Sequence, residues 1–335
     1  MSTQLIAYRR RRRIRLTTIT AVLGALVIGL YFTALMLGET WYSFSEVTAV
    51  MAGNTVPGAS FSVGEVRLPR ATLAVVAGAA FGVSGITFQT MLRNQLASPD
   101  IIGISSGASA AGVVAVVFFH YTQTATSIIS LVASLAVAGA VYLLSLHGGF
   151  TGTRLILIGI GVAAMLNAVV TYSLSRAAAW DLPTATRWLT GSLNSATWER
   201  AVPTSIIVLV LVPLLGLLSH QLNLLRLGDD LANGLGVRVQ FVRITAIIAA
   251  VTLIAVATAA CGPIAFVAFM AGPITMRIVG PSAPLIIPTA LVGALLTLTA
   301  DLAGQYLFGT RYPVGVITGV LGAPYLIFLL VRTSR

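Results

Sequence analysis

The sequence predicts an all-α polytopic membrane protein with about ten transmembrane helices. Three observations support this prediction. Hydrophobic residues make up 57% of the 335-residue chain, and charged residues make up only 9%. A third is that the apolar residues form runs of roughly 20, the length of a helix that crosses a bilayer. A soluble core of this size cannot bury so much apolar surface. The chain therefore divides into a basic cytoplasmic N-terminus, residues 1–15, and a single transmembrane domain, residues 16–335.

The N-terminus is a basic block directly before the first apolar run. Six of the 20 basic residues lie between Arg9 and Arg15, and the net charge of the chain is +11. A block at this place is typical of a cytoplasmic anchor on the bilayer surface, so we expect no nucleic acid as a partner. The run that follows is too long for a signal peptide and lacks a small-residue cleavage site. We interpret it as a retained first span.

The spans follow in order, joined by polar segments. Their expected ranges are 16–37, 69–91, a third ending near His120, 127–146, 154–176, a sixth ending near Ser219, 242–261, 264–279, 285–308 and 314–331. Two longer outer segments interrupt them, 39–68 and 177–200, and the second carries three tryptophans at positions typical of the interface. With the N-terminus inside, fourteen of the 20 arginines fall on the cytoplasmic side. This bias places both termini in the cytoplasm.

Glycine is frequent within the spans. Gly78, Gly82 and Gly85 lie in the second span, and Gly103 and Gly107 open the third. Small residues let helix backbones approach closely in a membrane. The pattern predicts a compact bundle and does not by itself indicate a function.

One polar stretch, residues 226–241 (RLGDDLANGLGVRVQF), interrupts the otherwise apolar second half of the chain. Asp229 and Asp230 after a glycine predict a turn followed by a helix N-terminus. Leu231, Leu235 and Val239 recur at helical spacing and predict one apolar stripe, which glycines at 234 and 236 interrupt. The pattern indicates one or two short amphipathic helices at the membrane surface. An ordinary loop between spans is an equally good interpretation of the pattern alone.

Missing residue types exclude several chemistries. The chain has no lysine, so it has no Walker A loop, and any ATP that drives it is hydrolysed by another chain. Cys261 is the single cysteine, which excludes an internal disulfide and a thiolate metal cluster. His120, His147 and His220 stand far apart at span ends, and no HExxH or GxSxG motif occurs. We expect no enzymatic site, no metal and no cofactor bound by this chain.

Four polar residues inside predicted spans are candidates for a translocation path: Gln89, Asn167, Asp301 and Gln305. Asp301 is the one acid deep in a span, and Gln305 lies one turn beyond on the same face. Because a buried carboxylate is costly, we expect Asp301 to be paired and to face the interior. A structural role is favoured, and the alternative is a proton carrier in an ion-coupled secondary transporter. Gln89 and Asn167 either line the path or bridge helices.

Several stretches together resemble the permease subunits of bacterial ABC importers for iron siderophores, haem and vitamin B12, the FecCD/BtuC-type family. They are RLPR (67–70), GAAFGVSGITFQ (78–89), RNQLASPDIIGISSGAS (93–109), GPIAFVAF (262–269) and PVGVITGVLGAPYLIFLL (313–330). The order and spacing of these stretches agree with those of the family from Glu65 onward. Through LILIGIGVAAMLNA (155–168), GSLNSATW (191–198) and LGDDLANGLGV (227–237) the chain is most similar to ferric-enterobactin permease subunits. This similarity implies a catecholate-type ferric siderophore as substrate.

The resemblance implies a type II ABC importer permease bundle in the bacterial cytoplasmic (inner) membrane. Two such subunits enclose one translocation path. The resemblance favours a paralogue over an identical copy as the second subunit. Two cytoplasmic ATPases carry ATP and magnesium, and an extracytoplasmic protein delivers the siderophore. Within coupling helices at about 222–240, the resemblance implies contact with the ATPase by Arg226, Leu227, Gly228, Asp229, Asp230, Ala232, Leu235, Gly236 and Val237.

The resemblance also implies outer arginines that pair with carboxylates of the binding protein. Arg67 and Arg70 match this pattern, although Arg70 is also placed to extend along the top of a span towards water. Arg311 stands where relatives often have a glutamate, which makes it an added docking cation or a departure from the docking pattern. Relatives usually carry Pro-His where this chain has Gly272 and Pro273, so a role for that histidine is not carried over.

Overall fold

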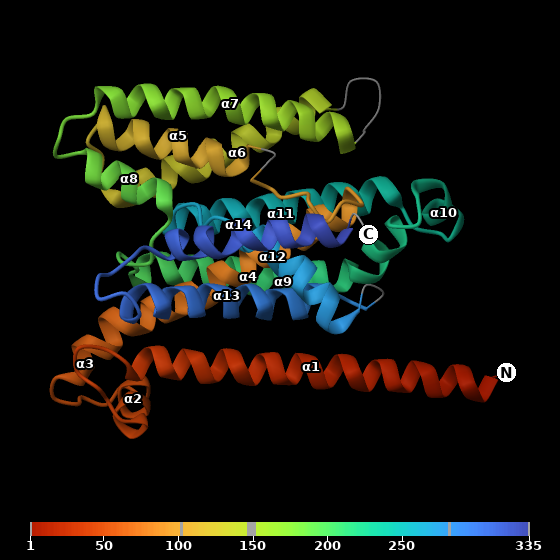
Figure 1. Cartoon of the computed structure of the whole chain (residues 1–335), viewed down its shortest axis with the longest axis horizontal. Coiled ribbons are helices and arrows are strands. Elements are labelled where there is room, and N and C mark those ends of the chain that lie inside the picture. Colours follow the sequence, from red (N-terminus) through yellow and green to blue (C-terminus); the bar gives the residue numbers. More distant parts are fainter. Residues whose placement is uncertain (1, 101–102, 146–151, 281–282, 334–335) are drawn as a thin grey trace.

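The chain folds as a bundle of long helices with short helices at both ends (Figure 1). The computed structural model describes residues 2–100, 103–145, 152–280 and 283–333, and these ranges contain helices and turns without a strand. Ile101, Ile102 and His147, which belong to stretches named above, lie outside the described residues. The all-α prediction is confirmed for the part of the chain that the structure describes.

The number of apolar helices agrees with the predicted spans. The elements are α1 (Ser2–Met36), α2 (Phe44–Met51), α3 (Ala59–Phe61), the π-helical turn η1 (Ser62–Arg67), α4 (Leu68–Met91), α5 (Ile104–Val117), α6 (Gln123–Ser145), α7 (Gly152–Arg176), α8 (Leu182–Thr190), α9 (Trp198–Leu225), α10 (Asp229–Gly234), α11 (Val239–Cys261), α12 (Val267–Val279), α13 (Ile286–Tyr306) and α14 (Val314–Thr333). Among the described residues, 7 helical runs are long and apolar enough to cross a membrane. The shorter apolar helices α5, α12 and α14 complete the set.

The helices α4 and α11 form the centre of the bundle. In each, 78% of the most apolar window is buried, whereas in α1 and α7 the corresponding share is 17%. Figure 1 shows α1 along one flank and α5, α6 and α7 along the other. The same view places α2, α3 and α8 at one end of the bundle and α10 at the opposite end. The flanking helices therefore present apolar side chains outwards, as a helix facing lipid or a partner subunit does.

The close helix packing predicted from glycine is present where α4 crosses α13. A Cβ atom added at Gly78 would overlap the carbonyl group of Gly293, and one added at Gly293 would overlap the carbonyl of Gly78. Further along α4, a Cβ atom at Gly85 would overlap the backbone of Ala268 in α12. Glycine is required at these crossings because the two backbones occupy the space of any side chain.

Three boundaries differ from the expected ones. α9 runs past Ser219 to Leu225, so residues 222–240 contain the end of α9, the single short helix α10 and the start of α11. α5 ends at Val117, and the chain turns at His120 with a φ of +48°. The basic block belongs to α1 itself, because arginine is a good helix former and no glycine or proline precedes the apolar run.

Candidate functional site

The polar segment between α9 and α11 is fixed to the bundle through one carboxylate. Asp229 accepts a hydrogen bond from Arg93 at 2.9 Å and one from Arg243 at 2.6 Å. Arg93 lies in the connection after α4, and its Nε also donates to the carbonyl of Leu225 at 3.0 Å. The start of α10 is therefore tied to the end of α9, to the connection after α4 and to α11 together.

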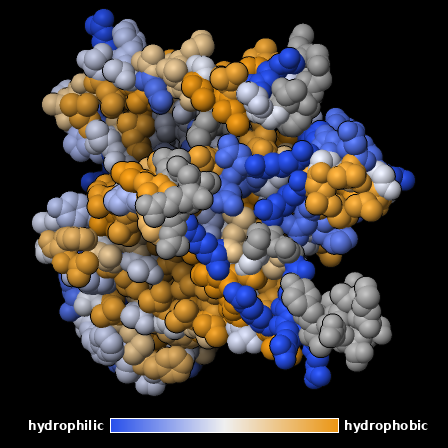
Figure 2. Space-filling view, turned by 45° about the vertical axis from the view of Figure 1, so that its right-hand side comes forward, coloured by the Kyte–Doolittle hydropathy of each residue, from blue (hydrophilic) through white to orange (hydrophobic). Residues whose placement is uncertain are grey.

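Above this attachment, α10 and the turns on both sides of it present leucines to solvent. Leu227, Leu231 and Leu235 are 57%, 62% and 61% exposed, while Ala232 and Val237 are buried beneath them. The predicted stripe of residues 231, 235 and 239 is therefore divided, because Val239 is buried at the start of α11. Leu227, Leu231 and Leu235 therefore form an exposed apolar ridge on a segment that is fixed to the bundle. This ridge lies at the end of the molecule where hydrophilic residues gather in Figure 2.

The turns on both sides of α10 depend on glycine. Gly228 has a φ of +118° and Gly236 a φ of +84°, a region that other residues adopt with strain. α10 ends at Gly234, as predicted, and begins with Asp229 and Asp230 in its first turn, where negative charge is favourable. All nine predicted coupling residues lie in this one segment, from Arg226 to Val237.

At the other end of the bundle, Arg70 and Asp301 form a buried salt bridge. Arg70 at the start of α4 donates through Nε and Nη2 to the two carboxylate oxygens at 2.9 and 2.8 Å. Gln305, one turn further along α13, donates to the same carboxylate at 2.7 Å. The expectation that Asp301 is paired and faces the interior is confirmed, and its partner is an arginine predicted to dock a binding protein.

Arg67 and Arg311, the other two predicted docking arginines, contact the connection between α1 and α2 or the end of α1. Arg67 donates to the carbonyls of Leu35, Met36 and Thr40 at 2.8 to 3.0 Å, so it satisfies carbonyls at the end of α1. Arg311 reaches Glu39 at 2.5 Å, and the two side chains are 64% and 87% exposed. Arg311 is therefore the most accessible of the three, and docking by any of them stays a prediction.

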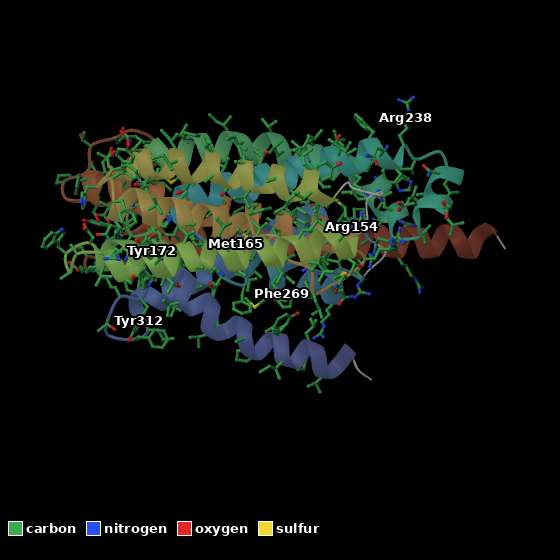
Figure 3. All side chains as sticks on the ribbon, turned by 90° about the horizontal axis from the view of Figure 1, so that it is seen from above. Arg154, Met165, Tyr172, Arg238, Phe269 and Tyr312 are labelled. Carbon is green, nitrogen blue, oxygen red and sulfur yellow. The ribbon has the colours of Figure 1, made fainter. Side chains whose placement is uncertain are left out.

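The predicted path residues Gln89 and Asn167 lie apart from each other and from Asp301. Gln89 is 4% exposed and donates to the carbonyl of Phe269 in α12 at 3.0 Å, so it bridges two helices. A Cβ atom added at Gly272 would overlap the carboxamide oxygen of Gln89, so the Gln89 side chain would have to shift. Asn167 is exposed on α7, the helix that carries Met165 and Tyr172 along its outer side in Figure 3.

Between α5, α8, α12 and α14 lies a cavity of about 490 Å³ that is lined in part by Asp100, a partly buried acid that the sequence analysis did not single out. Asp100 accepts hydrogen bonds from the hydroxyls of Ser98 and Ser105, directly before α5. Burial raises the pKa of this carboxyl, and the two hydroxyl donors oppose the shift. The Ser-Pro-Asp turn before a glycine-rich helix signals a helix start, but nothing local indicates that the acid is enclosed. Phe269 lines the same cavity and projects between α7 and α14 in Figure 3.

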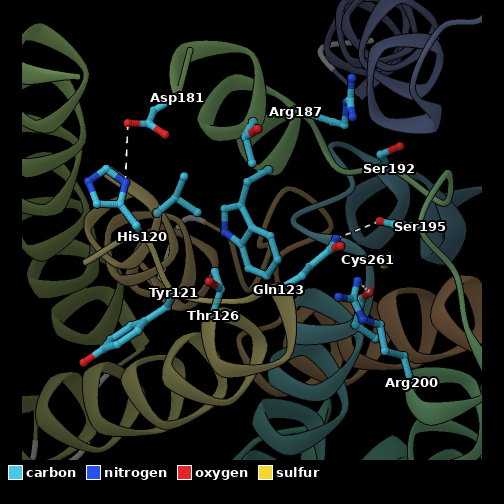
Figure 4. Close-up of a pocket in the computed structure, with 14 residues that line it drawn as sticks. His120, Tyr121, Gln123, Thr126, Asp181, Arg187, Ser192, Ser195, Arg200 and Cys261 are labelled. Carbon is cyan, nitrogen blue, oxygen red and sulfur yellow. Dashed lines mark hydrogen bonds and ion pairs between the residues drawn. The ribbon is translucent and has the colours of Figure 1, made fainter. Parts of the chain in front are cut away.

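A second cavity, of about 280 Å³, opens at the end of the bundle that carries α8 (Figure 4). His120 approaches Asp181 at 3.6 Å, and Gln123 donates to Ser195 at 2.7 Å, so the α5–α6 connection is tied to both sides of α8. Arg200 lines it from the first turn of α9. Of these residues the sequence analysis singled out His120 alone, as a span-end residue; Ser195 lies in the stretch GSLNSATW, and no pattern marks any of the others.

Comparisons with known proteins agree with this architecture. The model of the FecCD transport family matches residues 25–332. The ferric enterobactin transport system permease protein FepG of Escherichia coli is 40% identical over 325 residues, which cover 97% of this chain and 98% of that protein. The achromobactin transport system permease protein CbrC of Dickeya dadantii is 38% identical, over 96% and 94% of the two chains. A solved inward-facing structure of a putative metal-chelate type ABC transporter superposes with a TM-score of 0.84 at 27% identity, covering 94% of this chain and 99% of that one.

Proposed function

The chain belongs to the FecCD transport family, and from this premise we propose that it carries a ferric siderophore into the cytoplasm as the permease subunit of an ATP-driven importer. The proposed substrate is a catecholate chelate of the enterobactin kind. The name of the 40% identical relative supports this choice, since that protein transports ferric enterobactin. The achromobactin relative is the reason to test more than one chelate.

The observation that carries the proposal is the ridge of Leu231 on α10 with Leu227 and Leu235 in the turns that flank it. Three exposed leucines within nine residues are an unfavourable surface in water, and an apolar groove on a partner covers them. Asp229 ties this helix to α4, α9 and α11, so a partner that moves α10 acts on the centre of the bundle. We therefore assign the segment from Arg226 to Val237 to contact with a cytoplasmic ATPase that holds ATP and magnesium.

The assembly follows from this assignment. The α10 end and both termini face the cytoplasm of a bacterial cell, and the end with α2, α3 and α8 faces outwards. A second permease subunit completes the translocation path, and we favour a paralogue over an identical copy. Asn167, on the exposed side of α7, is a candidate to line this path. An extracytoplasmic binding protein delivers the chelate, with the exposed Arg311 as the leading docking residue.

The rival hypothesis is a proton-coupled transporter with Asp301 as carrier. Both carboxylate oxygens of Asp301 accept hydrogen bonds from Arg70, and one accepts a further bond from Gln305. A carrier must release and take up a proton in each cycle, which requires these three bonds to break and reform. This geometry supports a structural carboxylate and thus the ATP-driven mechanism.

The proposal is tested by uptake of iron-labelled siderophores into cells that carry the permease. One strain has an intact ATPase partner, and the matched strain has the phosphate-loop lysine of that ATPase replaced. We expect uptake of a catecholate chelate, lost with the disabled ATPase, and weaker uptake of citrate or hydroxamate chelates. Uptake that persists without ATPase activity contradicts the proposal.

A further inference from the structure

A cavity of about 610 Å³ lies at the α10 end of the molecule and borders the first residues of the proposed ATPase contact, Arg226 and Leu227. It opens between the N-terminal part of α1, the end of α9 and the connection that leads to α13. Its lining combines basic, polar and apolar groups: Arg12, His220, Asn223, Leu224, Arg226, Leu227 and Pro284. Two guanidinium groups thus converge on one cavity from segments far apart in the chain.

The position of the cavity along α1 corresponds to the headgroup layer of a bilayer. The apolar part of α1, from Leu16 to Met36, spans about 31 Å at 1.5 Å per residue, close to the thickness of the hydrocarbon layer. Arg12 lies one turn before Leu16, roughly 6 Å beyond the hydrocarbon edge. The headgroup layer extends roughly 5–8 Å on each side, so Arg12 lies at the depth of the lipid phosphates.

An exposed hydrogen bond connects the basic part of α1 to the bundle next to the cavity. Arg15, close to Arg12 on α1, donates to the carbonyl of Ile278 in the last turn of α12 at 3.1 Å. This bond fixes the basic part of α1 against the bundle. Figure 2, which looks towards this end of the molecule, shows strongly hydrophilic residues beside apolar surface.

We propose that this cavity binds the phosphate headgroup of an anionic phospholipid, with Arg12 and Arg226 contacting the phosphate. Guanidinium groups form the strongest contacts with phosphate because their donors are charged and lie in a fixed plane. Leu224 and Pro284 supply the apolar surface on which the glycerol and upper acyl carbons lie. The depth of Arg12 favours a lipid over a soluble anion, since bilayer phosphates already occupy this layer. The site joins α1 to the residue that opens the α10 segment, so bound lipid links the bilayer to that segment.

The test is native mass spectrometry of the full-length permease in detergent, titrated with phosphatidylglycerol. Arg12→Gln removes one guanidinium from the cavity, and an arginine near an anionic surface contributes about 1 kcal/mol, so we expect about a fivefold loss of affinity. Arg10→Gln is the matched control, because it removes the same charge from the same helix about 200° away. Arg12→Lys keeps a charge and should restore most of the binding. Phosphatidylcholine, which has no net charge, should bind the unchanged permease and the Arg12→Gln and Arg10→Gln variants with equal affinity.

Three results would overturn the proposal. Equal losses for Arg12→Gln and Arg10→Gln would show attraction to a basic helix without a built site. Full competition by millimolar inorganic phosphate would assign the cavity to a soluble anion. Unchanged lipid affinity in Arg12→Gln together with lost co-purification of an ATPase would assign the cavity to the partner protein. A selective loss in Arg12→Gln that phosphate does not reproduce supports the lipid.

Discussion

Arg70 donates two hydrogen bonds to the carboxylate of Asp301 and thereby joins the start of α4 to the last turns of α13. The two side chains are 17% and 5% exposed, so the ion pair is largely removed from water. It lies on the pair of helices whose backbones also meet at Gly78 and Gly293. The α4–α13 contact is therefore held by a charge pair near one end and by close backbone packing further along.

Asp301→Asn should destabilise the protein while leaving transport intact. Removing one partner of a buried ion pair leaves an uncompensated charge and costs about 3–5 kcal/mol, which a thermal unfolding assay in detergent detects. The double variant Arg70→Gln/Asp301→Asn should recover part of that loss. Uptake per folded molecule should persist, with an unchanged pH dependence. A variant that binds its ATPase but loses a pH dependence seen in the unchanged protein would instead support proton transport through Asp301.

Asp229→Asn should weaken coupling between ATP hydrolysis and uptake. The change removes the negative charge that holds Arg93 and Arg243, so α10 is no longer fixed to the centre of the bundle. We expect ATP hydrolysis by the assembled transporter to continue while uptake per ATP falls. Asp230→Asn is the comparison variant, because it removes a charge from the same proposed ATPase contact but leaves the bonds of Asp229 to Arg93 and Arg243 in place. Equal uptake per ATP in both variants would exclude a role for this attachment.

Leu231→Ser should reduce association with the ATPase without unfolding the permease. Leu231 is 62% exposed, and exposed positions of this kind usually change stability by about 0.5 kcal/mol or less. Ala232→Leu provides the contrast, because Ala232 is fully buried and overpacking typically costs about 1–3 kcal/mol. Co-purification and melting temperature measured together distinguish the two. An ATPase that binds the Leu231→Ser variant at unchanged affinity would place the contact elsewhere.

Gly78→Ala should destabilise the bundle although alanine favours helices. Its Cβ atom would overlap the Gly293 carbonyl, so α4 and α13 must separate, at a cost of about 1–3 kcal/mol. At Gly29 on α1 a Cβ atom meets nothing within 4 Å. Gly29→Ala should therefore be neutral or stabilise by up to about 1 kcal/mol. Thermal unfolding of the two variants side by side checks the prediction, and equal effects would contradict the close α4–α13 packing.

Asp100→Asn should stabilise the protein at neutral pH and have little effect at low pH. Burial raises the pKa of Asp100 above the ordinary 3.8, so the folded state keeps its proton to higher pH than the unfolded state does. Between the two pKa values the folded state binds more protons, and the free energy of unfolding falls as pH rises. Melting temperatures from pH 3.5 to pH 8 should show the gain from Asp100→Asn growing with pH. A gain from Asp100→Asn that does not grow with pH would contradict the raised pKa of Asp100.

The sequence by itself determined the membrane spans and the turns around α10. Hydropathy is a sum over neighbouring residues, so runs of about 20 apolar residues identify the helices without knowledge of their neighbours. The same holds for Asp229 and Asp230 at a helix start and for Gly234 at its end, because capping depends on local backbone geometry. The family motifs identified the segment from Arg226 to Val237 in the same local way.

Tertiary structure alone decided which polar groups meet. Arg70 and Asp301 are 231 residues apart, and Arg93 and Asp229 are 136 apart, so their pairing depends on how each helix is rotated and at what height it crosses its neighbour. The burial of Asp100 and the convergence of Arg12 with Arg226 have the same origin. Helix rotation and crossing height are set by packing over the whole bundle, including the glycine crossings of α4. No window of sequence contains that information.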